Sequence, residues 1–343
     1  MRRVSQALVP ADAASSLIPR MISEGIADRS AKISRDGAFR RVPIVPGRER
    51  DAEAMGFDIA EGEAYTMERR SPQERILEEF RDIPDAEAVL PMRWEFVGNI
   101  AILKLGGAPD ALKRRIGETY AKILNVGTVC ADSEGVSGEL RRPDMEVLYG
   151  SSTRSSKSEN GVIYEFDVAK AMYASGNTRE RQRMKDLDCA GETVVDMFAG
   201  IGYFTLPLAK FAGPRRVFAC EKNPDSYMFL LDNIKNNSVG DIVIPMLGDN
   251  RDIAGKRFAD RILMGYVQTT SEFLPKAAEM IKPGGMIHYH DTFRVGCSGR
   301  RIKEIFDGAC GPEGYSVERL REVKSFAPSV SHYVADVRIM RSD

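Results

Sequence analysis

The feature that most constrains the fold is an alternation of apolar strands with helical segments after residue 193. The spacing predicts helices over Tyr203–Phe211, Asp225–Asn236 and Ser271–Ile281. Strands that alternate with helices form parallel sheets covered on both faces. We therefore predict an α/β fold with a doubly wound, Rossmann-type sheet over residues 166–343. The expected strands are Thr193–Phe198, Arg216–Glu221, Ile242–Leu247, Arg261–Met264 and Met286–Tyr289.

A small basic α+β module is predicted for residues 1–70, with a helix at Ala13–Ser23 and a strand at Arg41–Val45. Residues 1–50 contain ten Lys and Arg against five Asp and Glu. This local excess fits both contact with RNA and a solvated face. The whole chain has a formal net charge of −1, so no global basic excess indicates a nucleic-acid partner.

Residues 71–165 are predicted to form a second, middle α+β domain. Its first helix begins with the capping-box pattern of Ser71 and Glu74. The remaining pattern predicts two strands within Trp94–Leu103, a helix over Ala108–Asn125, strands at Thr128–Cys130 and Met145–Tyr149, and a polar loop at Ser151–Asn160.

Cysteine usage and hydropathy exclude several classes of protein. The five cysteines are dispersed and form no CxxC pair, which argues against a disulfide framework or a structural zinc site. No run of about 18 apolar residues is present, as a transmembrane helix requires. Gln6, Pro10 and Asp12 interrupt any signal-peptide core. We therefore expect a cytoplasmic protein that does not associate with a membrane.

A glycine loop follows the first strand of the predicted sheet. It reads Asp196-Met-Phe-Ala-Gly-Ile-Gly202, and Gly200 and Gly202 let the backbone turn tightly and approach a ligand. A dinucleotide motif would have Gly or Ala three residues after Gly202. Thr205 stands there, so the pattern disfavours NAD.

Polar side chains also end the next two strands. Glu221 follows Asp196 by 25 residues and is placed to accept both hydroxyls of a ribose. Asp249 and Asn250 follow the third strand, where they can read an adenine edge. The carboxyl ends of parallel strands meet at one edge of a sheet, so this order indicates the S-adenosylmethionine pocket of a class I methyltransferase-like fold. Each residue alone could also be a loop cap or a turn former, but their joint occurrence in this order favours the cofactor pocket.

Residues from about 145 to 341 resemble two sister families that act on the same tRNA position. These are the archaeal/eukaryotic tRNA (guanine-37 N1)-methyltransferases and the aminocarboxypropyltransferases of wybutosine synthesis. Both carry a stretch like Met172-Tyr-Ala-Ser-Gly-Asn-Thr-Arg-Glu-Arg-Gln-Arg183, upstream of a DxFAGxG loop like Asp196–Gly202.

The segment after the fourth strand separates the two sisters. Methyltransferases carry an Asn-Pro-Pro or Asn-Leu-Pro motif there, whereas this chain has Met264-Gly-Tyr-Val-Gln-Thr-Thr270. That segment is similar to the aminocarboxypropyltransferases. So are Ser175-Gly-Asn177, in place of Ser-Pro-Arg, and Ile287-His-Tyr-His290.

The resemblance implies transfer of the 3-amino-3-carboxypropyl group of S-adenosylmethionine to carbon 7 of 4-demethylwyosine. This base is at position 37, in the anticodon loop of tRNA-Phe, and methylthioadenosine is released. No obligate protein partner is inferred. The alternatives are N1-methylation of guanine-37, which releases S-adenosylhomocysteine, and an RNA-binding protein with a vestigial cofactor pocket.

Five predicted cofactor-binding residues lie in the three strand-end segments. By resemblance, Phe198 and Gly200 border the cofactor, and Glu221 binds its ribose. Asp249 binds the adenine amine, and Asn250 binds the neighbouring edge.

The Met172–Arg183 stretch supplies the other predicted site residues. Arg181 matches a family arginine near the cofactor and is expected to pair with its carboxylate. Ser175 is expected to donate to the same tail, although the family serine also aligns with Ala174. Glu180 matches the general base proposed for the methyltransferases. In the transferase two roles stay open for it, a structural one and removal of the C7 proton.

Histidines and one tyrosine complete the candidate site. His288 and His290 project from the same face of a strand. This is a two-ligand geometry for a metal, but a polar lining near the target base is the favoured interpretation. His332 is the third histidine of the chain, and no metal is expected. Tyr266 either stacks on the flipped base or packs in the core.

Overall fold

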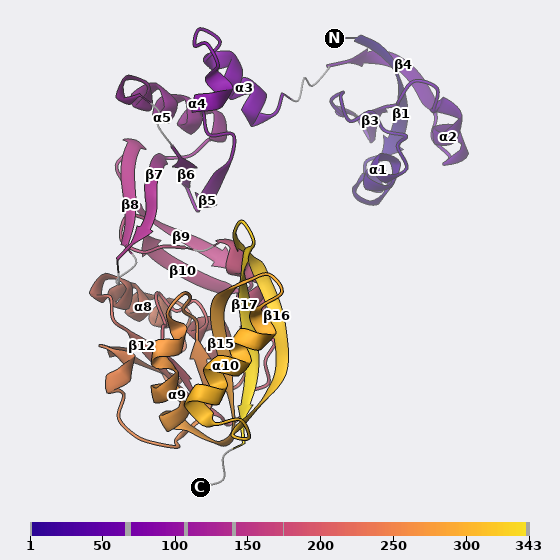
Figure 1. The fold of residues 1–343 in the computed structure, drawn as a ribbon. Helices are drawn as coiled ribbons and strands as arrows, with labels where there is room; N and C mark the ends of the chain where they lie inside the picture. Colours follow the sequence, from indigo (N-terminus) through magenta and orange to yellow (C-terminus); the bar gives the residue numbers. More distant parts are fainter. Residues whose placement is uncertain (1, 66–69, 106–108, 139–141, 174, 341–343) are drawn as a thin grey trace. The chain divides into compact units, whose positions relative to one another are not determined.

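The computed structural model describes residues 2–65, 70–105, 109–138, 142–173 and 175–340 (Figure 1). The chain divides into two compact units, Met1–Glu78 and Glu79–Asp343. Within the described residues, no helix is long and apolar enough to cross a membrane.

The first unit contains a four-stranded antiparallel sheet in the order β2-β3-β1-β4. Helix α1 lies where the sequence predicts it and buries Met21 in a small core with Val9 and Val42. Three of the four strands, β1, β2 and β4, were not predicted. The elements are β1 (Arg2–Pro10), α1 (Ala14–Ser23), β2 (Ser34–Asp36), β3 (Phe39–Pro43), α2 (Glu49–Ala54) and β4 (Ile59–Ala64).

The capping box predicted at Ser71 is present. The backbone N–H of Glu74 donates to Ser71 Oγ at 3.2 Å, and the backbone N–H of Ser71 donates to the Glu74 carboxylate at 2.6 Å. Helices α3 (Pro72–Glu79) and α4 (Ala86–Val89) then lead to a sheet in the order β5-β6-β7-β8. Its strands are β5 (Trp94–Val97), β6 (Ile100–Lys104), β7 (Thr128–Ser137) and β8 (Arg142–Tyr149), and α5 (Asp110–Leu124) connects β6 to β7.

A β-hairpin replaces most of the polar loop expected at Ser151–Asn160, so that prediction was wrong. Strand β9 (Arg154–Glu159) pairs antiparallel with β10 (Val162–Asp167). Its side chains are polar because none of them is buried. The turn residues Asn160 and Gly161 both have positive φ, 54° and 82°. An Asn-Gly pair is the preferred sequence for such a two-residue turn.

The predicted doubly wound sheet is confirmed, with seven strands in the order β13-β12-β11-β14-β15-β17-β16. The first five are parallel, whereas β17 pairs antiparallel with both neighbours. The hairpin of β16 and β17 was not predicted. The strands are β11 (Thr193–Asp196), β12 (Arg216–Glu221), β13 (Val243–Leu247), β14 (Ala259–Met264), β15 (Ile281–Arg294), β16 (Tyr315–Ala327) and β17 (Val330–Ile339).

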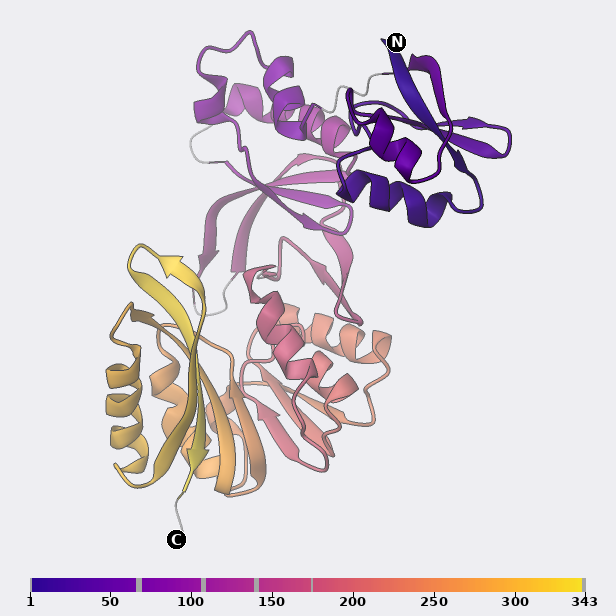
Figure 2. The ribbon, with the colours of Figure 1, turned by 90° about the vertical axis from the view of Figure 1, so that its right-hand side faces the viewer.

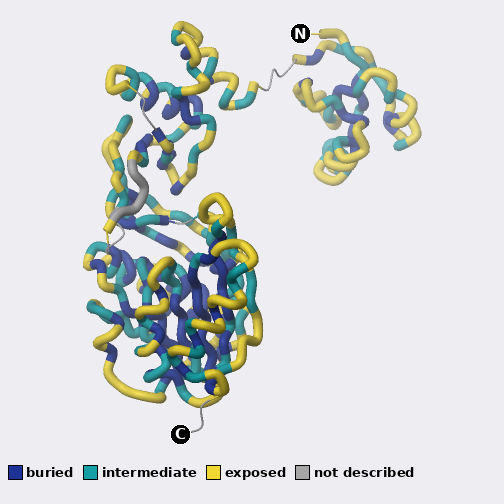
Figure 3. Tube along the Cα trace, viewed as in Figure 1, coloured by how far each residue is buried: buried dark blue, intermediate teal, exposed yellow. Residues whose placement is uncertain are grey.

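Helices cover both faces of this sheet (Figure 2). Val194 packs into the core on the side of α7 and α8, and its neighbour Val195 into the core on the side of α9 and α10, as strand alternation requires. Buried residues therefore follow the sheet (Figure 3). The helices are α6 (Thr178–Lys185), α7 (Thr205–Phe211), α8 (Pro224–Asn236), α9 (Leu274–Met280) and α10 (Ser298–Cys310), with short 3-10 turns η1 (Ser175–Asn177), η2 (Asn250–Asp252) and η3 (Thr270–Phe273).

Candidate functional site

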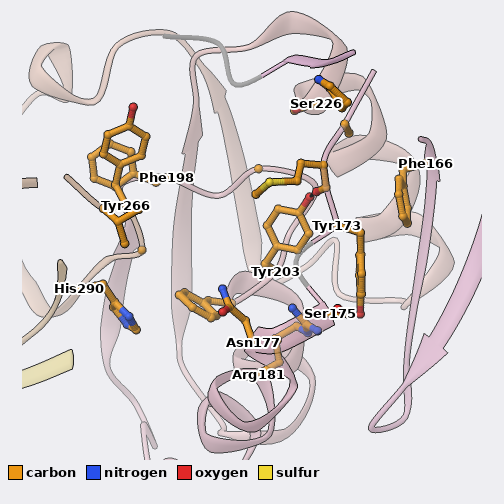
Figure 4. Close-up of a pocket in the computed structure, with 18 of the residues that line it drawn as sticks. Phe166, Tyr173, Ser175, Asn177, Arg181, Phe198, Tyr203, Ser226, Tyr266 and His290 are labelled. Atoms are coloured by element: carbon orange, nitrogen blue, oxygen red, sulfur yellow. Dashed lines mark hydrogen bonds between the residues drawn. The ribbon is translucent and has the colours of Figure 1, made fainter. Parts of the chain in front are cut away.

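A cavity of about 900 Å³ opens at the carboxyl ends of the parallel strands (Figure 4). Segments that follow β11, β12, β13 and β14 line it, together with η1 and residues of the β5–β8 sheet such as Trp94 and Met145. All seven predicted cofactor-binding residues line this cavity: Ser175, Arg181, Phe198, Gly200, Glu221, Asp249 and Asn250. The volume suits a nucleoside-sized molecule with room for a second group.

The glycine loop is held by its own first residue. Asp196 is buried and accepts hydrogen bonds from the Thr205 hydroxyl at 2.7 Å and the Phe198 N–H at 3.2 Å. Burial raises the pKa of Asp196 to about 6. Thr205, which departs from the dinucleotide pattern, thus binds the carboxylate that begins the loop. Gly202 has a φ of 101°, and a Cβ there would lie 2.6 Å from Leu206 Cγ, so this position requires glycine.

Glu221 joins the glycine loop to the end of β12. Its carboxylate accepts from the Gly200 N–H and from the Asn223 N–H, both at 2.7 Å. Burial raises the pKa of Glu221, although the backbone donors oppose this shift. Each carboxylate oxygen accepts more than one hydrogen bond. Both oxygens therefore keep acceptor capacity for a pair of hydroxyl groups.

Asp249 and Asn250 lie side by side after β13 but have different surroundings. The Asp249 carboxylate pairs with Arg251 at 2.6 Å and Lys222 at 3.1 Å. The hydrogen bond from Arg251 holds the pKa of Asp249 well below its usual range. The Asn250 amide donates to the Met197 carbonyl at 2.8 Å. Its Oδ1 is buried and has no hydrogen-bond partner among the described residues, which suits it to accept from a ligand.

Arg181 already has a carboxylate partner within the protein. Its guanidinium donates to Glu159 from Nε at 2.5 Å and from Nη2 at 3.1 Å. It also lies 4.6 Å from the centre of the Tyr173 ring. Ser175 lies at the start of η1, on the same side of the cavity as Arg181 (Figure 4). Ala174, the alternative alignment of the family serine, lies outside the described residues.

Two residues of the predicted site, Glu180 and His288, are not among the described residues that line the cavity. The Glu180 side chain is 3% exposed and pairs with Arg183 and Arg321, each at 2.9 Å. This arrangement fits the structural role considered for Glu180 better than proton transfer.

The segment after β14 is shaped by two close contacts. A Cβ at Gly265 would lie 2.7 Å from Phe204 Cε2, so the ring of Phe204 occupies the space that any side chain would need. The N–H of Gln268, which has a φ of 81°, donates to the Asp291 carboxylate at 2.7 Å. Tyr266 stacks on Phe198 with ring centres 5.0 Å apart, so its ring is paired within the protein (Figure 4).

The three histidines are buried and form two separate pairs. His288 Nδ1 lies 2.6 Å from Asp336, and burial lowers the pKa of His288 to about 4. His290 Nδ1 lies 3.0 Å from His332 Nε2, and both of these residues line the cavity. Within the described part of the chain, no group of three or more His, Cys, Asp or Glu is placed to hold a metal ion.

Many residues that line the cavity were not predicted as ligand-binding residues, and Asn177 and Lys324 are two of them. Asn177 is part of the Ser175-Gly-Asn177 segment on which the resemblance rests, so a sequence signal was available. Lys324 is on β16, a strand that was not predicted, and its neighbours carry no recognisable motif.

Comparison with known proteins gives two matches to family models. The TRM5/TYW2 methyltransferase domain matches residues 155–318, and the TYW2 N-terminal domain matches residues 74–153. Together these matches cover the β5–β8 sheet and most of the seven-stranded sheet.

Two curated relatives represent the two sister activities. The tRNA(Phe) (4-demethylwyosine(37)-C(7)) aminocarboxypropyltransferase of Pyrococcus horikoshii is 44% identical over 256 residues, 74% of this chain and 91% of that protein. The tRNA (guanine(37)-N(1))-methyltransferase Trm5b of Pyrococcus abyssi is 33% identical over 332 residues, 93% of this chain and 94% of that protein.

Solved structures of similar proteins contain adenosyl ligands. P. horikoshii TYW2 in complex with MeSAdo has a TM-score of 0.68 and 40% identity, and the match covers 79% of this chain and all of that one. M. jannaschii TYW2 in complex with AdoMet has a TM-score of 0.57 and 35% identity, over 73% of this chain and all of that one.

Proposed function

Because the chain belongs to the TRM5/TYW2 family, and within it to the tRNA(Phe) (4-demethylwyosine(37)-C(7)) aminocarboxypropyltransferases, we propose that it catalyses that transfer. The 3-amino-3-carboxypropyl group of S-adenosylmethionine moves to carbon 7 of 4-demethylwyosine at position 37 of tRNA-Phe. A carbon–carbon bond forms between C7 and the γ-carbon of the donor. The γ-carbon–sulfur bond breaks with its electron pair on sulfur, methylthioadenosine leaves, and the proton of C7 is lost.

The observation that carries this choice over N1-methylation is the segment after β14. Gly265 lies in the segment where the methyltransferases have the Asn-Pro motif. Because Gly265 has no side chain, the Phe204 ring packs against it. Asp291 then holds the backbone of Gln268. This part of the cavity wall therefore lacks the asparagine and proline that line the methyltransferase site.

The cavity offers hydrogen-bond acceptors to the hydroxyl and amine groups of the adenosine part of S-adenosylmethionine. We propose that Glu221 accepts the ribose hydroxyls, since both its oxygens keep acceptor capacity beside the Gly200 and Asn223 N–H groups. Asn250 Oδ1, buried without a partner among the described residues, and Asp249 are proposed for the adenine edge. Phe198 and Gly200 border this end of the cavity.

The amino-acid tail of the donor is proposed to extend toward Ser175 and Arg181, on the other side of the cavity (Figure 4). Glu159 already balances the charge of Arg181, so Arg181 would contribute hydrogen bonds rather than net charge. The sulfonium activates three carbons, and the carbon held in line with the nucleophile reacts. For this product, the γ-carbon must face the base.

The rest of the chain is proposed to present the tRNA. We assign residues 166–343 to catalysis, residues 71–165 to a middle domain that closes one wall of the cavity, and residues 1–70 to contact with tRNA. The local excess of positive charge in residues 1–50 supports the last assignment. Position 37 would reach the cavity as part of the anticodon loop. We place the reaction in the cytoplasm, with no protein partner required.

Mass spectrometry of the small-molecule product tests this function. The protein is incubated with S-adenosylmethionine and tRNA-Phe that carries 4-demethylwyosine, with unmodified tRNA-Phe in parallel. Methylthioadenosine formed only with the 4-demethylwyosine tRNA supports aminocarboxypropyl transfer. S-adenosylhomocysteine formed with the unmodified tRNA would make the protein a methyltransferase, in line with its match to Trm5b over 93% of the chain.

A further inference from the structure

Phe326, on β16, differs from the other aromatic residues that line the cavity. Each of the others contacts a second ring of the protein, as Tyr266 does with Phe198 and Phe204 with His290. Phe326 has no ring partner among the described residues, and it is 46% exposed. Its ring therefore offers a free face to a ligand in the cavity.

A β-bulge determines the position of Phe326 on its strand. Ser325 pairs with Ser331 of β17, and Ala327 pairs with Val330, so Phe326 is an extra residue with no partner opposite it. A bulge of this kind bends the strand and redirects a side chain, and bulges are frequent beside active sites. The bulge thus releases Phe326 from the regular ladder at the point where β16 borders the cavity.

Neighbouring elements hold the end of the hairpin that carries Phe326. The N–H of Val295, just after β15, donates to the carbonyl of Ser329 in the hairpin turn at 3.0 Å. Lys324 packs against Gly176 of η1, where a Cβ would lie 2.9 Å from Lys324 Cδ. Because β16 runs in the same direction as β15, this end lies at the carboxyl edge of the sheet (Figure 1). Phe326 is therefore in place before a ligand binds.

The acceptor base needs a stacking partner in the cavity. Before its C7 can reach the donor, the base must leave the stack of the anticodon loop, which costs free energy. Enzymes that act on a nucleobase recover part of this cost by stacking the base on aromatic or apolar side chains. The ring of Tyr266, which the sequence suggested for this role, stacks on Phe198 instead. Phe326 provides the free ring face that Tyr266 does not.

We propose that Phe326 stacks on the base at position 37 and thereby favours 4-demethylwyosine over guanine. A tricyclic base has a larger ring face than guanine, so the same phenyl ring gains more contact with the modified base. This inference rests on the proposed function and deepens it, because it names a specificity-determining residue for the acceptor rather than for the donor.

Three RNAs that differ only at position 37 test this contact. Binding to the full chain is measured with tRNA-Phe that carries 4-demethylwyosine, guanine or no base at this position. Methylthioadenosine is present in place of the donor, so no group is transferred. Phe326→Ala is expected to raise Kd for the 4-demethylwyosine tRNA about tenfold or more, the usual contribution of stacking one base on an aromatic residue. The loss should be smaller with guanine and absent when position 37 has no base.

Two further variants separate stacking from folding. Phe326→Tyr keeps the ring and should bind all three RNAs as the wild type does. Val317→Ala is the matched control on the same strand, because Val317 is 40% exposed and is not among the described residues that line the cavity. It should change none of the three Kd values. Wild-type affinity for S-adenosylmethionine in each variant shows that the chain is folded.

Two results would overturn the stacking role. Equal weakening of all three RNAs by Phe326→Ala would place the ring against another part of the tRNA. Unchanged affinity for the 4-demethylwyosine tRNA in folded Phe326→Ala would remove Phe326 from the acceptor site. A wild-type chain that binds this tRNA but forms no methylthioadenosine from S-adenosylmethionine would instead overturn the proposed function.

Discussion

The carboxylate of Glu159, at the end of β9, holds the guanidinium of Arg181, on α6, through two hydrogen bonds of 2.5 and 3.1 Å. The two side chains are only 10% and 2% exposed. Glu159 also accepts from the Thr178 hydroxyl at 2.9 Å and the Tyr173 hydroxyl at 3.0 Å. Burial alone would raise the pKa of Glu159, but the hydrogen bond and charge of Arg181 lower it overall. One carboxylate thus fixes the β9–β10 hairpin to the segment that lines the cavity.

Removal of this carboxylate should destabilise the protein strongly. Glu159→Ala leaves the buried guanidinium of Arg181 uncompensated, which typically costs about 3–5 kcal/mol. We expect a loss of that order in the free energy of unfolding, measured by urea denaturation. The matched control is Glu118→Ala, which breaks an exposed pair with Arg114 and should cost less than about 1 kcal/mol. Equal losses in the two variants would contradict the structural role of Glu159.

Loss of the Glu221 side chain should weaken cofactor binding. Glu221→Ala removes the proposed acceptor of both ribose hydroxyls and also frees the Gly200 and Asn223 N–H groups. A hydrogen bond to a charged group is worth about 1.5–3 kcal/mol, so Kd for S-adenosylmethionine should rise at least about tenfold. Titration calorimetry measures this, with Glu118→Gln as the control. Unchanged affinity in Glu221→Ala would remove Glu221 from the pocket.

The fold could be predicted where hydrophobic periodicity was strong. The strands from β11 to β15 are short apolar runs separated by helices, and the sequence located all five. The hairpin of β16 and β17 was missed because β16 has no buried residue, and its apolar residues Val317, Leu320, Val323 and Phe326 recur every third position instead of every second. Strand β9 was missed for a similar reason, although the Asn160-Gly161 pair is a recognisable hairpin turn.

Residues that follow strands in a fixed order, such as Gly200 and Glu221, could be located from the sequence, and both line the cavity. Each of these has a position set by local chain geometry. The partners of Arg181 and Gly176 could not be predicted, because Glu159 and Lys324 reach them from hairpins whose placement depends on tertiary packing. The role of Gly265 also depends on a distant residue, Phe204, whose ring fills the space above it.

A side chain at residue 265 should disturb the cavity. In Gly265→Ala the new Cβ meets Phe204 Cε2 at 2.7 Å, and Phe204 in turn stacks on His290 with ring centres 5.3 Å apart. We expect a loss of about 1–3 kcal/mol in stability from overpacking and a lower rate of methylthioadenosine formation. The control is Gly308→Ala in α10, where a Cβ meets nothing within 4 Å. It should stabilise the helix by up to about 1 kcal/mol. Full activity in Gly265→Ala would mean that the Phe204 ring is free to move.

The raised pKa of Asp196 makes stability depend on pH in a defined direction. Burial raises this pKa from 3.8 to about 6, so the native state binds a proton more tightly than the unfolded state. The stabilisation from this proton is complete below pH 3.8 and is lost as the pH rises through about 6. Above that range the buried, ionised carboxylate reduces the free energy of unfolding.

Asp196→Asn should remove this dependence. Thr205 and Phe198 donate to different oxygens of the carboxylate, so the single amide oxygen keeps one of the two hydrogen bonds. The loss of the other does not depend on pH and cancels when two pH values are compared. A shift of about 2 pKa units corresponds to about 3 kcal/mol in full. The difference in free energy of unfolding between Asp196→Asn and wild type should therefore favour the variant by about 2 kcal/mol more at pH 8 than at pH 4. It falls short of about 3 kcal/mol because Asp196 in the unfolded wild type is only partly ionised at pH 4. Urea denaturation of the ligand-free proteins at the two pH values measures this difference. The contributions of other titrating groups to the free energy of unfolding are the same in both proteins and cancel. A relative stability that does not change with pH would show that Asp196 titrates near its ordinary pKa, and that its burial is compensated by contacts beyond those of Thr205 and Phe198.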